Sequence, residues 1–142
     1  MTAPTLNPKR RIRGVNLGGW LLLEKWMTPS LFDGLSARDE TGFCVELGNQ
    51  AESRLRKHWD TFITESDFMW IAERGLNCVR IPVGHWIFGP PYPYHPKYEG
   101  NPHPFVTGSL EYLDRAFEWA EKHKISILID FHAAPGCQNG FD

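Results

Sequence analysis

Hydrophobic and polar residues alternate along the chain in blocks that favour strands and helices in turn. Apolar segments predict strands at residues 13–17, 77–83 and 125–131. The third segment is almost continuously apolar, which is typical of a parallel strand covered on both faces. Pro82 cannot donate to a strand ladder, so we expect the second strand to end there.

Helical patterns separate these strands. Residues 51–59 predict one helix, and Thr64 with Asp67 three positions later forms a capping box that starts another, with Gly75 as its stop. Ser109 is positioned to cap a third helix. The apolar stripe expected on that third helix comprises Leu110, Leu113, Ala116, Phe117 and Ala120.

The order strand, helix, strand, helix, strand predicts right-handed crossovers and an α/β fold with parallel strands. Three strands are fewer than an ordinary α/β domain contains. The chain stops at Asp142, in a Gly-, Pro- and Asn-rich segment where a loop should lead into the next helix. We therefore expect an incomplete domain.

Composition narrows the classes of function. The 142 residues carry 15 Lys and Arg against 17 Asp and Glu, a net charge of −2, which argues against a nucleic-acid-binding protein. The longest apolar run covers residues 20–23, far short of the roughly 20 residues that span a membrane. No secretory signal is visible at the N-terminus, which predicts a cytoplasmic protein, or a secreted one if the N-terminus is incomplete.

Motifs for metals and phosphates are absent from the sequence. The three cysteines, Cys44, Cys78 and Cys137, are widely spaced and odd in number, which favours free thiols over a zinc site or a disulfide framework. The adjacent glycines at positions 18 and 19 lack the spacing of a nucleotide-binding loop.

Three polar residues follow or end the predicted strands: Glu24, Arg80 and His132. Ligands of parallel α/β proteins bind at the carboxyl edge of the sheet, so all three are candidate site residues. Arg80 offers a planar fork for a carboxylate, His132 a donor or acceptor near neutral pH, and Glu24 an acceptor for sugar hydroxyls. Each residue also has a structural alternative. Arg80 could form an ion pair at a strand end, His132 could be a hydrogen-bonded histidine under a loop, and Glu24 could be a solvated surface charge.

Asp130 lies two residues before His132, so both side chains point to the same face of the predicted strand. Its carboxylate could orient the imidazole. We favour the other interpretation, in which Asp130 accepts backbone N–H groups of neighbouring loops.

Six tryptophans make the chain rich in flat apolar rings, which also serve as sugar-binding surfaces. Trp20, Trp26 and Trp86 fall at strand ends or in loops and are candidates for such surfaces. The other three, Trp59, Trp70 and Trp119, fall on predicted helices, where packing is expected.

Five segments, taken in order, resemble the fungal-type exo-β-1,3-glucanases of glycoside hydrolase family 5. The likeness extends over nearly the whole chain from about residue 12 onward, and several long motifs in order make it specific. The segments are residues 13–24, 28–32, 56–64, 75–83 and 129–142.

The resemblance implies a (β/α)8 TIM barrel, of which this chain would supply about the first three strands. Residues 1–11 would form an N-terminal tail, and residues 12–142 an incomplete barrel domain. The family is retaining, with an acid/base glutamate after an asparagine at the end of the fourth strand and a nucleophile at the end of the seventh. No Asn-Glu pair occurs in this chain. Both catalytic glutamates are therefore expected beyond Asp142, and the chain alone is expected to be inactive.

The resemblance also assigns supporting roles. Arg80 matches an arginine that holds the nucleophile, and His132 a histidine that lines the subsite of the cleaved sugar. Glu24 matches an acidic residue that bonds hydroxyls of that sugar. Asn139 and Phe141 match the cleft rim, with Phe141 as a stacking ring. Neither metal nor cofactor is implied.

The chain departs from the yeast members of the family at two places. Residues 133–137 read Ala-Ala-Pro-Gly-Cys in place of Gly-Ala-Pro-Gly-Ser, and the loop of residues 89–106 is longer and more aromatic. The sequence thus predicts a fragment of a retaining exo-β-1,3-glucanase that acts on β-glucan or its oligosaccharides. The alternatives are a non-catalytic β-glucan-binding protein and an inactive truncated product.

Overall fold

A computed structural model describes residues 11–90 and 104–135. The three strands β1 (Gly14–Asn16), β2 (Cys78–Gly84) and β3 (Ser126–Ala133) form one parallel sheet in the order β1-β2-β3. This part of the chain confirms the α/β class with parallel strands. The helices are α1 (Glu40–Leu47), α2 (Ala51–Phe62), α3 (Glu65–Glu73) and α4 (Ser109–His123), with short 3-10 turns η1 (Pro29–Phe32) and η2 (Gly48–Gln50).

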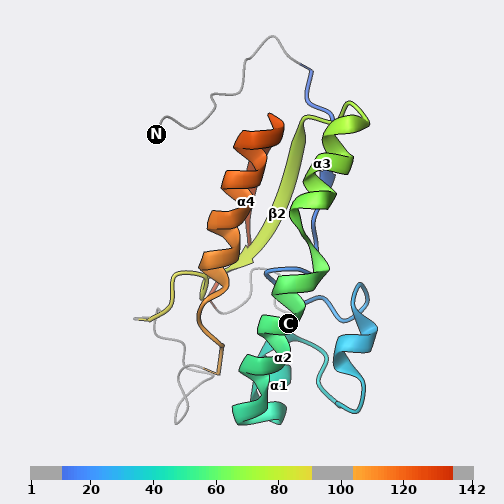
Figure 1. Ribbon diagram of the computed structural model, residues 1–142. Helices are drawn as coiled ribbons and strands as arrows, with labels where there is room; N and C mark the ends of the chain where they lie inside the picture. The colour runs from blue at the N-terminus through green and yellow to red at the C-terminus, as the bar shows by residue number, and fades with distance from the viewer. Residues whose placement is uncertain (1–10, 91–103, 136–142) are drawn as a thin grey trace.

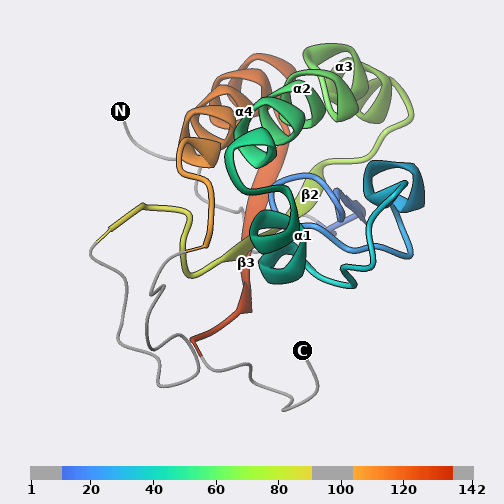
Figure 2. The ribbon, with the colours of Figure 1, turned by 90° about the horizontal axis from the view of Figure 1, so that it is seen from below.

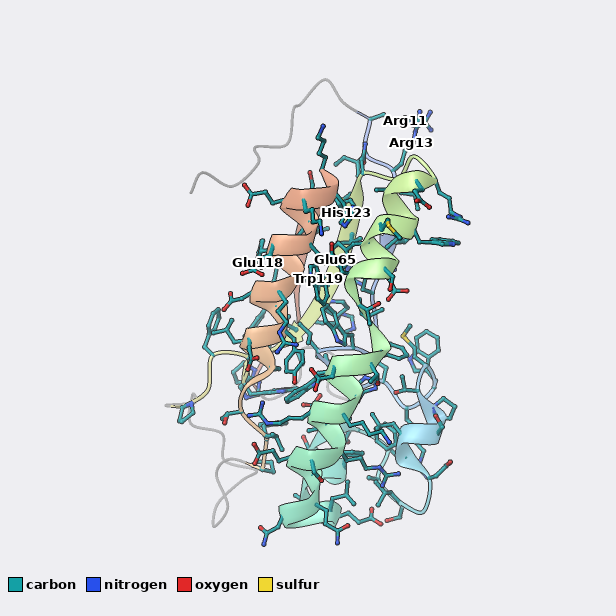
Figure 3. The ribbon with its side chains drawn as sticks, in the orientation of Figure 1. Arg11, Arg13, Glu65, Glu118, Trp119 and His123 are labelled. Atoms are coloured by element: carbon teal, nitrogen blue, oxygen red, sulfur yellow. The ribbon has the colours of Figure 1, made fainter. Side chains whose placement is uncertain are left out.

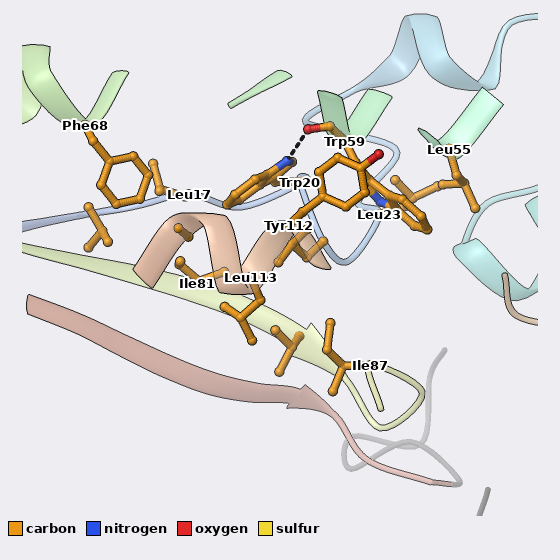
Figure 4. Packing of buried hydrophobic residues seen from close by; sticks show 14 of the residues in the cluster. Leu17, Trp20, Leu23, Leu55, Trp59, Phe68, Ile81, Ile87, Tyr112 and Leu113 are labelled. Atoms are coloured by element: carbon orange, nitrogen blue, oxygen red, sulfur yellow. Dashed lines mark hydrogen bonds between the residues drawn. The ribbon is translucent and has the colours of Figure 1, made fainter. Parts of the chain in front are cut away.

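Helices α2, α3 and α4 lie on one side of the strands (Figures 1 and 2). Side chains alternate along a strand, so the face of β2 toward these helices carries Val79, Ile81 and Val83, which are all buried. Phe68 of α3 and Leu113 of α4 belong to the same core as these three residues (Figure 4). Burial of this face against three helices is the main source of stability in the fold.

Helices α3 and α4 are joined at their surface as well as in the core. The Glu65 carboxylate of α3 accepts from Lys122 Nζ at 2.5 Å and from His123 Nε2 at 3.2 Å, both of α4 (Figure 3). The Lys122–Glu65 pair is well exposed, so it adds less to stability than the core does.

Strand β2 runs past the proline at which its end was predicted. Pro82 pairs with Asp130 of β3, and the strand continues to Gly84. The Arg80 carbonyl accepts from the Leu17 N–H, so residue 82, two positions on, also directs its backbone toward the β1 side. β1 has already ended there at Asn16, and the missing N–H of Pro82 therefore removes no ladder bond.

The capping box of α3 is confirmed. The Thr64 N–H donates to Asp67 Oδ2 at 2.7 Å, which satisfies a donor at the start of the helix. Gly75 follows the helix with a positive φ of 74°, as its predicted stop requires.

Helix α4 begins as expected, but its cap is different. Gly108, with a φ of 109°, is the N-cap, while Ser109 is buried as the first helical residue. L side chains rarely adopt such a φ, so this position favours glycine. The buried face includes Tyr112 and leaves Phe117 43% exposed, which shifts the stripe away from the predicted one.

Two further features differ from the sequence analysis. Helix α1 was not predicted, because Gly42 and the β-branched residues within it give no one-sided apolar stripe. Asp39 is its N-cap, and Asp39 Oδ1 accepts the Gly42 N–H at 2.7 Å. β3 is not covered on both faces within the described residues, since Leu128 is 54% exposed and Phe131 56%.

The loop after β1 is fixed to α2 by an indole. Trp20 is fully buried, and its Nε1 donates to the Trp59 carbonyl at 3.0 Å (Figure 4). That carbonyl lies in the last turn of α2, where carbonyls lack partners within the helix. We predict that Trp20→Phe lowers the free energy of unfolding by about 2–4 kcal/mol, because it removes this bond and leaves a cavity.

Urea unfolding at fixed pH measures this loss, with Trp70→Phe as the matched control. Trp70 is 53% exposed and stacks only on Arg74 in the described structure, so its replacement should cost less than about 1 kcal/mol. Equal losses in the two variants would contradict the role given to Trp20.

Candidate functional site

Three polar side chains of β2 and β3 meet on the face of the sheet opposite the helices. Arg80 Nη2 lies 2.5 Å from Asp130 Oδ2, and His132 Nδ1 lies 2.8 Å from the same oxygen. Arg80 pairs with Leu128 and Pro82 with Asp130, so the side chains at 80, 130 and 132 share one face. We call Arg80, Asp130 and His132 the β2–β3 polar cluster.

His132 Nδ1 lies within hydrogen-bond distance of both other members of the cluster. It is 2.8 Å from Asp130 Oδ2 and 3.2 Å from Arg80 Nη2. A protonated Nδ1 donates to Asp130, and an unprotonated Nδ1 accepts from Arg80, so either tautomer of the ring has a partner in the cluster. Because Asp130 contacts both Arg80 and His132, it sets the orientation of two side chains at once.

These positions correct the sequence interpretation at two points. Arg80 is the third residue of β2 and not at its carboxyl end, and its long side chain reaches Asp130 from there. Within the described residues Asp130 contacts two side chains and no backbone N–H group, so the favoured interpretation, in which it accepts backbone N–H groups, is wrong there. The carboxylate instead lies against the imidazole, as in the alternative interpretation. The side chains of Arg80, Asp130 and His132 are 32%, 26% and 42% exposed, so the cluster is open to a ligand.

Glu24 lies in the loop that follows β1, partly exposed. Its Oε2 accepts from the Nε1 of Trp26, the neighbouring indole, at 3.1 Å. A Cβ at Gly18 would meet Met27 Sδ at 2.8 Å and Glu24 Oε1 at 3.1 Å, so the loop folds closely over a glycine here. Glu24 is thus a carboxylate with one oxygen held by an indole.

The three tryptophans proposed as sugar-binding surfaces differ in their exposure. Trp26 is 77% exposed and fits such a role, whereas Trp20 and Trp86 are buried, so their assignment is wrong. Trp86 stacks on Phe105 with ring centroids 3.9 Å apart and planes 2° apart.

Among the helical tryptophans, packing is confirmed for two. Trp59 is buried, and Trp119 packs against Trp20 and Phe68. The packing role predicted for Trp70 is wrong, because this residue is exposed on α3.

Sequence reasoning missed Glu40, the first residue of α1. Its side chain is buried, Oε2 accepts the Leu23 N–H at 2.9 Å, and Oε1 accepts from Trp86 Nε1 at 2.9 Å. Burial is the main reason that the pKa of Glu40 rises to about 7; Asp39 raises it further and the two hydrogen bonds oppose the shift. Both partners are distant in sequence, and the helix itself was missed, so no local signal marked this residue.

Besides Asp39, the Cys44 thiol is a titratable group close to Glu40. Burial, with the nearby Glu40 charge as a second cause, raises the pKa of the Cys44 thiol to about 12. Cys44 therefore stays neutral and adds no charge beside the carboxylate.

Other candidate residues are placed as follows. Cys44 and Cys78 are free thiols, as expected, while Asn139, Phe141 and Cys137 lie outside the described residues. Within residues 11–90 and 104–135, no group of three His, Cys, Asp or Glu side chains is arranged to hold a metal ion. The described helices also include none that is long and apolar enough to cross a membrane.

Curated proteins of fungi are similar to nearly the whole chain. Probable glucan 1,3-beta-glucosidase A of Emericella nidulans is 52% identical over 144 residues, covering 99% of this chain and 33% of that protein. Glucan 1,3-beta-glucosidase of Blumeria graminis is 46% identical over 139 residues, covering 94% and 30%. The chain therefore spans about a third of the length of these relatives, and the similarity confirms the resemblance read from its motifs.

Solved structures agree on the fold. Rutinosidase from Aspergillus niger superposes with a TM-score of 0.75 at 30% identity, over 94% of this chain and 36% of that one. The crystal structure of AoRut superposes with the same TM-score at 31% identity. No family model matches the chain.

The raised pKa of Glu40 predicts a pH-dependent stability. The carboxyl keeps its proton up to about pH 7 in the folded protein but only up to about 4.5 in the unfolded chain, so unfolding between these values releases a proton. The stability that Glu40 adds is full below about pH 4.5 and is lost as the pH rises to about 7. We expect the loss relative to Glu40→Gln to reach about 3 kcal/mol.

Denaturant unfolding of the wild type and Glu40→Gln at half-unit steps from pH 4 to 8 measures this difference. An NMR titration of the Glu40 side-chain carbonyl gives the folded pKa directly. A stability difference that stays constant over the whole range would contradict the assignment.

Proposed function

Since the chain is homologous to the glucan 1,3-beta-glucosidases and fits an N-terminal part of a glycoside hydrolase, we propose that the complete protein is a retaining exo-β-1,3-glucanase of glycoside hydrolase family 5. In this proposal residues 12–142 supply the first three strands of a (β/α)8 barrel. The observation that carries it is the β2–β3 polar cluster, which presents a charged fork and an oriented imidazole in a chain about half identical to such enzymes.

The proposed chemistry uses two glutamates that this chain does not supply, an acid/base and a nucleophile. Arg80 has five N–H donors, and Asp130 accepts from Nη2. Nη1 lies 3.5 Å from Asn16 Oδ1, at the limit of a hydrogen bond, so Arg80 keeps donors for a nucleophile carboxylate. Such a contact holds the nucleophile ionised and aimed at the sugar.

His132 and Glu24 would bind the first sugar. The side chain of His132, held beside Asp130 and 42% exposed, would hydrogen-bond a sugar hydroxyl through a ring nitrogen. The Glu24 carboxylate accepts hydroxyls beside the exposed face of Trp26, a flat ring suited to the C–H face of a sugar. Asn139 and Phe141 keep their proposed place at the rim.

An experiment with laminarin distinguishes the proposed function from its two alternatives. A non-catalytic β-glucan-binding protein would bind laminarin without cleaving it, and an inactive truncated product would do neither. The 142-residue chain alone is expected to show no glycosidase turnover, because the two carboxylates of a retaining mechanism are not in it. Hydrolysis of laminarin by the pure chain would contradict the proposal.

Arg80→Lys tests the proposed role of the guanidinium. Lysine keeps the charge but loses the planar fork, so we expect kcat of the complete protein on laminarioligosaccharides to fall about a hundredfold. Arg74→Lys is the matched control, because Arg74 stacks on exposed Trp70 and should leave kcat unchanged. Unchanged kinetics of Arg80→Lys would show that Arg80 does not hold the nucleophile.

Asp130→Asn tests the proposed role of the cluster behind the reacting groups. The amide lacks the negative charge that both Arg80 and His132 contact at Oδ2, and its NH2 group adds a donor beside them, so their common orientation is weakened. We expect kcat/KM to fall about ten- to a hundredfold, by analogy with carboxylates that orient metal-bound histidines. Stopped or steady-state hydrolysis assays measure it, with Asp60→Asn on the surface of α2 as the control. Equal kinetics in both variants would remove Asp130 from the site.

A further inference from the structure

Glu40 is buried between two loops that follow neighbouring strands. One is the loop after β1, which offers the Leu23 N–H, and the other is the loop after β2, which offers Trp86 Nε1. Each carboxylate oxygen accepts one of these donors at 2.9 Å. Helix α1 thus joins two loops that parallel α/β proteins use for ligands.

The first bond fixes the backbone beside the candidate sugar-binding carboxylate. Leu23 directly precedes Glu24, so its N–H bond to a buried side chain holds the chain one residue before the ligand-facing group. Leu22 adds packing on the same side, since it forms a buried cluster with Trp86 and Phe105. The side chain of Glu24 therefore extends from a backbone that is held in place.

The second bond fixes the indole that closes β2. A Cβ at Gly84 would lie 2.5 Å from the Trp86 ring, so the indole packs directly on the strand end. The indole also stacks on Phe105, which precedes α4 in the sequence. The orientation of Trp86 is therefore tied to the segment before α4.

We propose that Glu40 is a positioning residue of the sugar site, whose carboxylate ties the loop after β1 to the loop after β2 and thereby places Glu24. This inference rests on the proposed function of Glu24. Glu40 acts through Leu23 and Trp86 and touches no substrate. A carboxyl group suits this place because both of its oxygens keep lone pairs that accept an N–H, whether or not it is ionised. An amide instead puts an NH2 donor, which cannot accept, against one of the two N–H groups.

A set of four variants of the complete protein separates positioning from simple stabilisation. Glu40→Gln is nearly isosteric and sets its NH2 group against one N–H donor. Trp86→Phe removes the indole donor but keeps a ring. In the double variant the amide oxygen faces Leu23, and its NH2 no longer meets an N–H group.

Glu46→Gln is the matched control for Glu40→Gln. Glu46 lies on the same helix α1 and its carboxylate also accepts backbone N–H groups, from Ser36 and Ala37 at 3.0 and 2.9 Å. Ser36 and Ala37 lie between η1 and α1, at least 13 positions after Leu23 in the sequence, so the control loses a bond of the same kind at a different place.

The kinetic readout is the division between KM and kcat on laminarioligosaccharides, well below the unfolding temperature of every variant. We expect Glu40→Gln to raise KM about tenfold with kcat nearly unchanged, since the sugar-binding carboxylate is displaced and the reacting groups are not. Trp86→Phe in the Glu40→Gln background should recover most of the KM. Glu46→Gln should match the wild type.

A second readout does not depend on the reaction. Amide hydrogen exchange at Leu23 should quicken at least tenfold in Glu40→Gln, return toward the wild-type rate in the double variant, and stay unchanged in Glu46→Gln. If the wild type does not cleave β-glucan, the proposed function fails and Leu23 exchange alone decides whether Glu40 ties the loops.

Two results would overturn the inference. One is an active wild type in which Glu40→Gln and Glu46→Gln have the same KM. The other is a KM for the double variant as high as that of Glu40→Gln, which would show that the clash with the indole donor is not the cause.

Discussion

The parallel pairing of β2 with β1 and β3 is the constraint on which the rest of the structure depends. Because side chains alternate along β2, one register decides both faces of the sheet. Val79, Ile81 and Val83 enter the core under the helices, and Arg80 is left on the opposite face beside Asp130. A slip of one residue would bury the guanidinium against α3 and α4 and expose the valines. The apolar core therefore stabilises the register that assembles the polar cluster.

Polar groups inside the fold hold the loop after β1, where apolar packing alone would allow it to slide. Trp20 Nε1 bonds the Trp59 carbonyl, His58 Nε2 bonds the Gly19 carbonyl at 2.7 Å, and Glu40 accepts the Leu23 N–H. Each bond is directional, and a buried donor or acceptor left without a partner is costly. These bonds give the loop one conformation over the nine residues from Asn16 to Glu24.

Local sequence signals predicted what depends on neighbours along the chain. The Thr64 capping box, the helix from residue 51 and the apolar third strand all follow from patterns within one element. Asp130 and His132 were found on one face because a strand has a period of two. The continuation of β2 past Pro82 was not predictable, since it depends on where β1 ends. Glu40 and the burial of Trp86 were missed for the same reason, because their partners lie 17 and 46 residues from Glu40.

Two titratable groups hold the loop after β1, and they respond to pH in opposite directions. Burial lowers the pKa of His58, so the stability that it adds is present above its ordinary value of 6.5 and is lost as the pH falls. Burial raises the pKa of Glu40 to about 7, so its share is present below about 4.5 and is lost as the pH rises. As the pH falls, protonation of His58 places a charge in a buried site and costs stability, while protonation of Glu40 removes a buried charge and adds stability. Opposed titrations of this kind flatten the total dependence on pH, and each group shows its own dependence only when the other is replaced.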